Sequence, residues 1–470
     1  MPSVLAPKVQ NIPMSDGSGF PAFDAADLDA AADRLQQAGI RLVIGTMVNA
    51  AGITLAKSVP VARLGAFHRA GMGAAPVWHV FCIDGAIAFT DSISAVGDLR
   101  LRIDPTGLRC LGGGLAWAPA DMFRQDGSRD PACARGTLAR VQERAATAGY
   151  RALVGHELEF MLVAADGTAL DDAPWAPYGL TGLLDREQFL TDLLAALEDS
   201  DAHVEQLHAE YGRNQFELSL APGDPLAAAD TVVLAKIILG RVARAHKLQA
   251  SFSPVPFPGS VGNGAHQHFS LSLGGAPLFS GGPGPYGITE AGGAAIGGII
   301  QGLPEVQGLL TGSILSGIRL TPGAWSGAAL CWGLENREAS VRFVGGGAGN
   351  PHGANVEVKV IDGSANVYLA SAAILALALE GITSRSGLPA EVAGDPSRLS
   401  AAERQATGIG AVSDSPSEII TSLDNSASAR RLLGNEVVDA TVAVRRHEQE
   451  THGARDPKEL AALFRLAWSI

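Results

Sequence analysis

Two carboxylates separated by one residue lie in a strongly apolar part of the sequence. Glu157 and Glu159 occur in GHELEFML, with the apolar stretches ALVG and FMLV on either side. Side chains alternate between the two faces of a β-strand, so both carboxylates would point to the same face. A pair of glutamates on a strand is usually a solvated surface, but the apolar flanks favour a structured site here.

A second pair of carboxylates lies on either side of a glycine-containing turn. Glu210 and Glu217 occur in HAEYGRNQFELSL, one on each of two short predicted strands. Two like charges brought to one place repel each other unless a cation or a base neutralises them. This pair therefore also predicts a place that attracts positive charge.

Two histidines and a fifth carboxylate complete the set. His266 and His268 follow a Gly-Asn-Gly turn in GNGAHQHFSLSL and share one strand face, and Glu357 and Lys359 share a strand face in ANVEVKVID. A carboxylate-rich set with one imidazole suits hard divalent cations, because Mg²⁺ and Mn²⁺ prefer oxygen ligands. The number of ligands indicates two metals, an arrangement that stabilises charge during phosphoryl transfer.

Three arginines could bind anionic groups beside these ligands. Arg319 occurs in IRLTPGAW, and Arg337 and Arg342 occur in ENREASVRF. A guanidinium group can form two parallel hydrogen bonds to a carboxylate or a phosphate, although each arginine taken alone is better explained by a surface ion pair. The sequence has no P-loop motif and no GxSxG motif, and its one GxGxxG segment, at residues 282–287, contains two prolines that indicate a surface loop.

The periodicity of the sequence predicts an α+β protein that positions these side chains on strands. A helix is expected at residues 27–38, a hairpin from residues 41–49 and 53–61, and a strand at residues 95–105. These elements indicate a small domain over residues 26–105 that follows an aperiodic arm at residues 1–25. Strands alternating with longer helices then predict one larger domain over residues 106–470.

The composition narrows the class of protein. The chain has 470 residues, 47% of them hydrophobic, and a formal net charge of −13, which argues against nucleic-acid binding. Its four cysteines have no CxxC spacing, and no secretory signal precedes the first predicted helix. The longest apolar run, VYLASAAILALALEGI, is too short to span a bilayer and predicts a buried helix. We expect a cytoplasmic enzyme that binds neither nucleic acid nor a membrane.

Six segments in this order resemble the glutamine synthetase family, from about residue 40 to the C-terminus. They are GHELEF, HAEYGRNQFELS, GNGAHQHFSLS, RLTPGAW, ENREASVRF and EVKVIDGSANVYLASAAILALALEGI. The resemblance implies an N-terminal β-grasp domain and a C-terminal catalytic domain whose antiparallel sheet forms half of a funnel. It also implies a homo-oligomer, typically a dodecamer of two stacked hexameric rings, with sites between neighbouring subunits.

The resemblance also assigns roles to the candidate residues. One Mg²⁺ or Mn²⁺ ion is expected on Glu157, His266 and Glu357, and a second on Glu159, Glu210 and Glu217. The groups expected at the phosphates of ATP, which is a substrate, are His268, Ser270, Arg337 and Arg342. The groups expected at glutamate are Gly262, Gly264, Arg319 and Lys359. Arg319 and Arg337 would also take part in catalysis, which transfers a phosphoryl group to the γ-carboxylate of glutamate before an amine displaces phosphate.

The sequence departs from this family where the amine binds. Trp325 stands where the ammonia-using enzymes have a glutamate, and in CIDGAIAF a family serine is replaced by Ile87, while Asp84 is retained. Apolar surface in place of polar groups would stabilise an organic amine with an apolar body. The resemblance thus implies a γ-glutamylamide synthetase that uses an alkyl or aromatic amine, with Asp84 as the residue that receives the amine's proton.

Other departures leave alternatives open. Lys359 and Asn355 replace family arginines, and Val261 replaces an asparagine that holds the amino-acid substrate. A glutamine synthetase that uses ammonia, or a non-catalytic structural relative, therefore remains an alternative. No tyrosine follows Tyr368, which excludes adenylylation of the family's C-terminal tyrosine. Whether the amine is aniline-like, an alkylamine, a polyamine or ammonia is not determined by the sequence.

Overall fold

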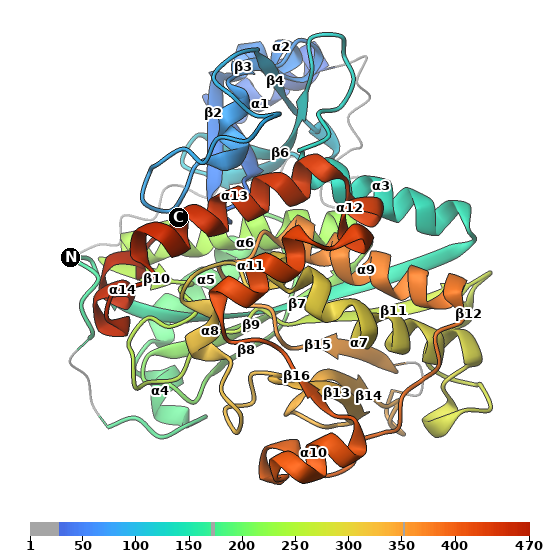
Figure 1. Ribbon diagram of the computed structural model, residues 1–470. Helices are drawn as coiled ribbons and strands as arrows, with labels where there is room; N and C mark the ends of the chain where they lie inside the picture. Colours follow the sequence, from blue (N-terminus) through green and yellow to red (C-terminus); the bar gives the residue numbers. More distant parts are fainter. Residues whose placement is uncertain (1–27, 171–173, 351–352) are drawn as a thin grey trace.

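A computed structural model describes residues 28–170, 174–350 and 353–470 of the chain. The arm predicted at residues 1–25 lies outside these ranges. In Figure 1 a small sheet lies at the top, helices cross the middle, and a larger sheet lies below them. The architecture is α+β, as the sequence predicts.

The N-terminal sheet has six strands in the order β2-β1-β6-β4-β3, with β5 paired to β6. The predicted hairpin is confirmed, because β1 and β2 pair antiparallel with Val48 opposite Thr54. Helices α1 and α2 pack on this sheet around buried Val43, Phe67 and Leu101. The elements of this part are α1 (Leu28–Gln37), β1 (Leu42–Val48), β2 (Thr54–Pro60), α2 (Leu64–Arg69), β3 (Met72–Ala74), β4 (Leu99–Ile103), β5 (Arg109–Gly112) and β6 (Leu115–Phe123).

The N-terminal sheet continues beyond residue 105, where the sequence pattern places the end of the small domain. β6 pairs in parallel with β1 and antiparallel with β4, so Leu115–Phe123 lies at the centre of this sheet. The division at residue 105 therefore separates two strands from the sheet that they complete. The pairing of β6 with β1 joins segments that are far apart in the sequence, and local alternation does not reveal such a pairing.

The larger sheet has ten strands, in the order β16-β13-β14-β15-β11-β7-β9-β8, with β10 paired to β7 and β12 to β11. Its central strands β15, β11, β7 and β9 are joined by antiparallel pairings. The strands are β7 (Tyr150–Ala164), β8 (Val204–Ala209), β9 (Gln215–Gly223), β10 (Leu248–Ser251), β11 (Gln267–Leu273), β12 (Ala276–Pro277), β13 (Ala329–Leu334), β14 (Ala339–Val344), β15 (Asn355–Val358) and β16 (Gly410–Ala411).

Helices surround the large sheet, some of them between it and the N-terminal sheet and others on its far side (Figure 1). They are α3 (Ala134–Thr147), α4 (Leu180–Leu184), α5 (Glu187–Asp199), α6 (Pro225–Ala245), α7 (Glu290–Leu310), α8 (Ser316–Arg319), α9 (Val367–Ser384), α10 (Ala401–Thr407), α11 (Pro416–Asp424), α12 (Ala427–Leu433), α13 (Asn435–His452) and α14 (Pro457–Phe464). Short 3-10 helices lie at Val61–Arg63, Pro76–Val80, Pro105–Gly107, Pro285–Gly287 and Pro396–Arg398.

Helix α9 is the buried core helix that the apolar run predicts. By length and composition alone it could cross a membrane, but 72% of it is buried inside the protein, where it packs on α7 and α3. Its first turn is capped by Asn366, whose side chain accepts from the backbone N–H groups of Tyr368 and Leu369. The same side chain donates to the carbonyls of Val48 and Asn49, so the cap also ties α9 to the end of β1.

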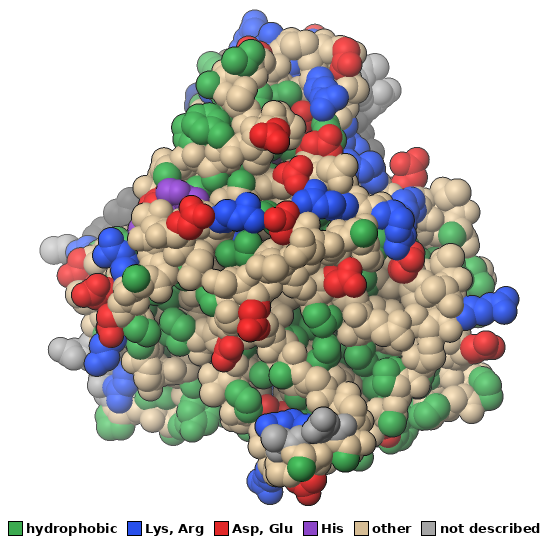
Figure 2. Space-filling view, viewed as in Figure 1, with side chains coloured by type: hydrophobic (Ala, Val, Ile, Leu, Met, Phe, Trp, Pro, Cys, Tyr) green, Lys and Arg blue, Asp and Glu red, His purple; other side chains and the backbone are tan. Residues whose placement is uncertain are grey.

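Charged side chains on the face shown in Figure 2 alternate in sign along the band formed by α11, α12 and α13. Ion pairs account for part of this pattern: Arg430 pairs with Asp439 and Asp424, and Arg446 also pairs with Asp424. Such exposed pairs contribute little to stability, about 0–1 kcal/mol each. This face is therefore a solvated surface of mixed charge.

Candidate active site

The strands β7, β11 and β15 lie side by side in the large sheet and carry most of the predicted ligands. His268 is opposite Gly155 of β7 on one side and Glu357 of β15 on the other. Just before β11 the chain still pairs with β7, because the N–H of Glu157 donates to the carbonyl of His266. This register brings residues more than 80 positions apart in sequence to one face of the sheet.

The first predicted metal group is brought together as the resemblance implies. Nδ1 of His266 lies 3.2 Å from a carboxylate oxygen of Glu157 and 3.4 Å from one of Glu357. One ligand atom of each of these three residues lies within 4.8 Å of the other two. Both His266 and Glu357 are buried, so their position is fixed by the surrounding sheet.

The second predicted group is arranged around Glu217, opposite Glu159 in the pairing of β7 with β9. Ligand atoms of Glu159, Glu217 and His266 lie within 4.8 Å of one another, and so do those of His208, Glu210 and Glu217. Glu159 and Glu210 thus each meet Glu217. The triplet around Glu210 includes His208, which the sequence analysis did not single out.

His208 holds Glu210 in place. Its Nε2 lies 3.0 Å from Oε1 of Glu210, and the backbone N–H of Tyr211 donates to the other oxygen at 2.8 Å. Burial opposes ionisation of Glu210, but these two hydrogen bonds lower its pKa. His208 precedes Glu210 by two residues in HAE, so the same-face rule that pairs Glu157 with Glu159 could have revealed it.

The negative charge in this cluster is unevenly balanced. Burial opposes ionisation of Glu357, but the Lys359 ammonium, 3.1 Å away, and the two histidines lower its pKa to about 2. Glu217 is different, because burial and the neighbouring carboxylates of Glu157, Glu159 and Glu210 raise its pKa to about 10. Several carboxylates crowded around a histidine are the donor set of a hard divalent cation, so the residues present fit Mg²⁺ or Mn²⁺.

The turn before β11 brings the backbone against the ligands. A side-chain carbon at Gly264 would lie 2.5 Å from Nε2 of His266 and 2.8 Å from Nη2 of Arg319, so any larger residue there would displace both side chains. The backbone N–H of Gly264 donates to Glu159 at 2.8 Å. Between the two glycines, the fully buried Asn263 donates to the carbonyls of Ser251 and Ser253, which holds the turn in place.

Arg319 is buried rather than paired at the surface. Its guanidinium group donates to the carbonyls of Val360 and Lys359, and its Nη2 lies 3.4 Å from Nε2 of His266. Burial lowers the pKa of this guanidinium group. Helix α8 therefore delivers a buried cation beside the metal-type cluster, where it could bind a carboxylate substrate.

The residues predicted at the phosphates lie at the other border of the cluster. His268 lies 3.2 Å from Glu157, and its Nδ1 lies 2.9 Å from the amide oxygen of Asn355. Burial opposes protonation of His268, but the neighbouring carboxylates of Glu157 and Glu357 raise its pKa. Arg342 pairs with Glu357 at 3.2 Å and also with Glu335.

Two other residues predicted at the phosphates are placed less tightly. Ser270 lies half-buried on β11, opposite Leu153 of β7. Arg337 is exposed on the turn between β13 and β14. The structure thus does not place Arg337 against the carboxylate cluster as it does Arg342.

Trp325 lies on a loop fixed by a buried glutamate. It has a positive φ of 54° and a side chain that is 49% exposed. The carboxylate of Glu338 accepts from the backbone N–H groups of Trp325, at 2.9 Å, and Gly323, at 3.2 Å. Glu338 was missed by the sequence reasoning, although it follows Arg337 directly in ENREAS.

Asp84 lies away from the carboxylate cluster of its own chain. It is in a loop of the N-terminal part and contacts His447 and His452 of α13, at 2.8 Å and 3.0 Å. Ile87 of the same loop is 38% exposed. Within one chain, therefore, Asp84 and Ile87 lie together, and among the described residues no hydrogen bond or ion pair joins them to Trp325.

Fold and site together define an enzyme-like α+β protein with a carboxylate-rich cluster on the face of a large, mostly antiparallel sheet, in which only β13 and β14 pair in parallel among the strands described. Residues 131–461 match the glutamine synthetase catalytic domain. The chain belongs to the glutamine synthetase family, whose members depend on ATP and divalent metals.

Individual relatives extend this match over almost the whole chain. A gamma-glutamylpolyamine synthetase of Streptomyces coelicolor is 36% identical over 465 residues, which are 96% of this chain and 99% of that protein. A glutamine synthetase of Pyrococcus abyssi is 32% identical and covers 70% of this chain and 74% of its own length. Among solved structures, a glutamine synthase homologue matches with a TM-score of 0.82, at 28% identity, over 91% of this chain and 99% of its own.

A further solved structure, described as a GmaS/ADP complex, matches with a TM-score of 0.80 at 25% identity. It covers 90% of this chain and 96% of its own. The N-terminal sheet and the large sheet are thus both part of the shared fold.

Proposed function

We propose that the protein is a glutamate–amine ligase that joins the γ-carboxylate of L-glutamate to an organic amine at the expense of ATP. The observation that carries the proposal is a complete metal-type cluster combined with apolar residues at the amine positions. Trp325 and Ile87 both expose large apolar surfaces. The full-length similarity to a gamma-glutamylpolyamine synthetase supports an amine larger than ammonia.

The reaction proceeds in two steps. An oxygen of the γ-carboxylate attacks the γ-phosphorus of ATP, which releases ADP and gives a γ-glutamyl phosphate. The amine nitrogen then attacks the carbonyl carbon, phosphate leaves, and the nitrogen loses a proton. Divalent cations, when bound, neutralise the negative charge on the phosphoryl oxygens.

The residues of this chain would bind and orient the two reactants of the first step. Arg319 is suited to the γ-carboxylate, because it is buried beside the cluster and a guanidinium group matches a carboxylate geometrically. Gly262 and Gly264 would let the backbone approach glutamate closely. Lys359 points its ammonium group at Glu357, so it contributes positive charge at the border of the glutamate site rather than a two-pronged contact.

The phosphates of ATP would bind on the side of His268 and Ser270. Arg342 is already anchored by Glu335 and Glu357 and can therefore present its guanidinium group to an anion without first being ordered. Arg337, being exposed, would have to close onto the nucleotide. We propose that both stabilise charge during phosphoryl transfer.

Asp84 would receive the amine in a neighbouring subunit's site. Burial opposes its ionisation, but hydrogen bonds from the Ala86 N–H and from His447 and His452 lower the pKa of Asp84 to about 2. It therefore stays ionised across the neutral range and attracts an ammonium group. This role requires a ring-shaped homo-oligomer, and we propose the dodecamer of two stacked hexamers, which sedimentation equilibrium would test.

The proposal is tested by measuring phosphate release that depends on both ATP and glutamate, with a panel of amines. The panel contains ammonium, ethylamine, putrescine, spermidine and aniline, with Mg²⁺ or Mn²⁺ supplied in separate series. We expect an organic amine to give the highest kcat/KM, with the matching γ-glutamylamide detected by mass spectrometry. Ammonium outperforming every organic amine would show a glutamine synthetase, and no ATP turnover with any amine would show a non-catalytic relative.

A further inference from the structure

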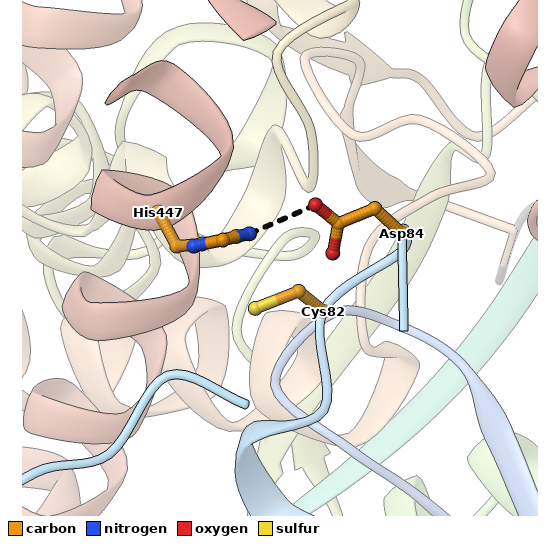
Figure 3. Close-up of side chains that lie close together, drawn as sticks. All are labelled: Cys82, Asp84 and His447. Atoms are coloured by element: carbon orange, nitrogen blue, oxygen red, sulfur yellow. Dashed lines mark hydrogen bonds and ion pairs between the residues drawn. The ribbon is translucent and has the colours of Figure 1, made fainter. Parts of the chain in front are cut away.

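The loop that carries Asp84 is held by the C-terminal helix α13. Figure 3 shows the side chains of Asp84 and His447 pointing toward each other, with the Cys82 side chain beside them. Nε2 of His447 and Nε2 of His452 lie 2.8 Å and 3.0 Å from the same oxygen, Oδ2 of Asp84. Two imidazoles from one helix therefore meet one carboxylate oxygen from the other end of the chain.

The hydrogen-bonding capacity of the Asp84 carboxylate is almost fully used. Each carboxylate oxygen has two lone pairs. Oδ2 faces two imidazole nitrogens, and Oδ1 accepts from the backbone N–H of Ala86 at 3.0 Å. One lone pair of Oδ1 is left for a further donor, and the side chain is 20% exposed.

His452 is fixed as a hydrogen-bond donor. Nε of Arg455 donates to its Nδ1 at 3.2 Å, which leaves the imidazole proton on Nε2, the atom that faces Asp84. Its ring packs edge-on against Phe464 with centroids 5.0 Å apart, and its side chain is only 6% exposed. The protein therefore commits this histidine to one geometry toward Asp84.

A metal site at the same place is less well supported by the contacts. Ligand atoms of Cys82, Asp84 and His447 lie within 4.8 Å of one another. However, the Cys82 thiol is buried and donates to the carbonyl of Val80, and burial raises its pKa to about 12. With a protonated thiol and a protonated Nε2 on His452, the cluster presents hydrogen-bond donors to Asp84 rather than free ligands for a cation.

We propose that His447 and His452 are positioning residues for the amine, because they hold the Asp84 carboxylate so that its remaining lone pair receives an N–H of the amine. This inference rests on the proposed function, in which Asp84 binds the amine of a neighbouring subunit's site. Helix α13 of one subunit would then help to determine which amine binds in the site of the neighbouring subunit. Hydrogen bonds to a charged group are stronger than those between neutral groups, so losing both would let the carboxylate rotate.

The test uses the full-length protein with His447→Ala, His452→Ala, the double alanine variant, and the double variant with glutamine at both positions. The Nε2 amide of glutamine can reproduce the N–H of a histidine Nε2. We expect the double alanine variant to raise KM for the amine by about tenfold or more, with kcat and KM for glutamate and ATP changed less than about twofold. The double glutamine variant should restore most of the amine affinity.

His246→Ala provides the matched control, because His246 also pairs with an aspartate, Asp192, at 2.9 Å and with similar exposure. It should leave all three KM values unchanged. If the double alanine variant does not fold, the KM for the amine of the His447→Ala variant tests the inference. The His447 side chain is 28% exposed, so its removal should be tolerated.

Three results would overturn the inference. They are an unchanged KM for the amine in the alanine variants, an equal change in all kinetic constants, and one equivalent of zinc per chain that is lost with His447→Ala. The kinetics are measured with the best organic amine and with ammonium. A chain that uses only ammonium would disprove the proposed function, while a selective rise in KM for ammonium would still support the positioning role.

Discussion

Two clusters of buried acidic side chains in this protein are balanced in opposite ways. Around Arg135, at the start of α3, the carboxylates of Asp104, Asp121 and Asp230 lie within 2.7–2.9 Å of guanidinium nitrogens. The hydroxyl of Tyr368 also donates to Asp230 at 2.8 Å. This cluster contains its own cation, and it joins β6 of the N-terminal sheet to α6 and α9 of the larger part.

The cluster on the large sheet lacks such a partner at its centre. Glu217 is surrounded by the carboxylates of Glu157, Glu159 and Glu210, and His208, its nearest imidazole in the Glu210 group, lies 3.9 Å away. Burying like charges without compensation costs several kcal/mol. The Arg135 cluster thus has its balancing cation within the protein, whereas we propose that the sheet cluster is balanced only when divalent cations bind.

The largest effect is expected when Arg135, the cation within the first cluster, is removed. Arg135→Met should lower the free energy of unfolding by about 3–5 kcal/mol, because it removes the buried cation that balances three carboxylates and leaves them only weaker partners, such as Arg129 at 3.4 Å from Asp121. Urea denaturation followed by circular dichroism measures this change. Arg151→Met is the control, since Arg151 pairs with Asp224 at an exposed site and should cost less than about 1 kcal/mol. Equal midpoints for the two variants would contradict the structural role of Arg135.

Removing a carboxylate from the sheet cluster should have the opposite effect on stability. Glu217→Gln should raise the melting temperature in the presence of a chelator, because a neutral amide can be buried beside the other carboxylates without the proton that Glu217 must take up on folding. The same variant should lose ligase activity by about a hundredfold or more, since even residues that only support metal ligands cost 10–100-fold. Glu205→Gln, at an exposed position on β8, should change neither quantity. A destabilised Glu217→Gln protein in chelator would contradict the account.

The raised pKa of Glu217 makes the stability of the folded protein depend on pH. Its pKa of about 10 in the folded protein lies above the ordinary value of 4.5, so between these values the folded protein holds a proton that the unfolded chain has released. The contribution of this group to stability is therefore full below about pH 4.5 and falls as pH rises towards 10.

A divalent cation would displace that proton, so the rise in melting temperature caused by Mn²⁺ should grow from pH 6 to pH 8.5. Differential scanning fluorimetry with Mn²⁺ and with chelator measures it. Glu217→Gln should weaken the pH dependence, and a shift by Mn²⁺ that is the same at every pH would contradict the assignment.

The smallest expected effect is at the edge of the Arg135 cluster. Tyr368→Phe removes one hydrogen bond to Asp230 but leaves both of its contacts with Arg135, so it should cost about 1.5–3 kcal/mol. Chemical denaturation measures this change, and a loss comparable with that of Arg135→Met would show that the hydroxyl group, rather than the guanidinium group, balances the cluster.

The strands of the sheet site could be predicted because each carries its chemistry in a two-residue period with apolar neighbours. Glu157 with Glu159 and His266 with His268 follow this rule, and the structure places each pair on one face. His208 obeys the same rule and was overlooked. Glu338 was missed because its role is to accept two backbone N–H groups from a loop, which no spacing reveals.

Features that depend on distant pairing could not be predicted. The end of the N-terminal sheet was placed too early because β6 pairs with β1 across more than 60 residues. The contact of Asp84 with His447 and His452 joins residues more than 360 positions apart. Local periodicity does not predict contacts between distant segments. Isolated histidines on a helix indicate only a solvated or packed surface.

A competition reaction tests the central claim most directly. Purified protein with ATP, Mn²⁺ and limiting glutamate is given ammonium and putrescine at equal concentrations, and the products are quantified by mass spectrometry. The ratio of the products then reports the ratio of the two kcat/KM values. A glutamate–amine ligase should yield γ-glutamylputrescine in large excess over glutamine. If the amine panel shows another organic amine to be the best substrate, that amine takes the place of putrescine, and its γ-glutamylamide should exceed glutamine in the same way. Glutamine as the main product against every organic amine would contradict the account.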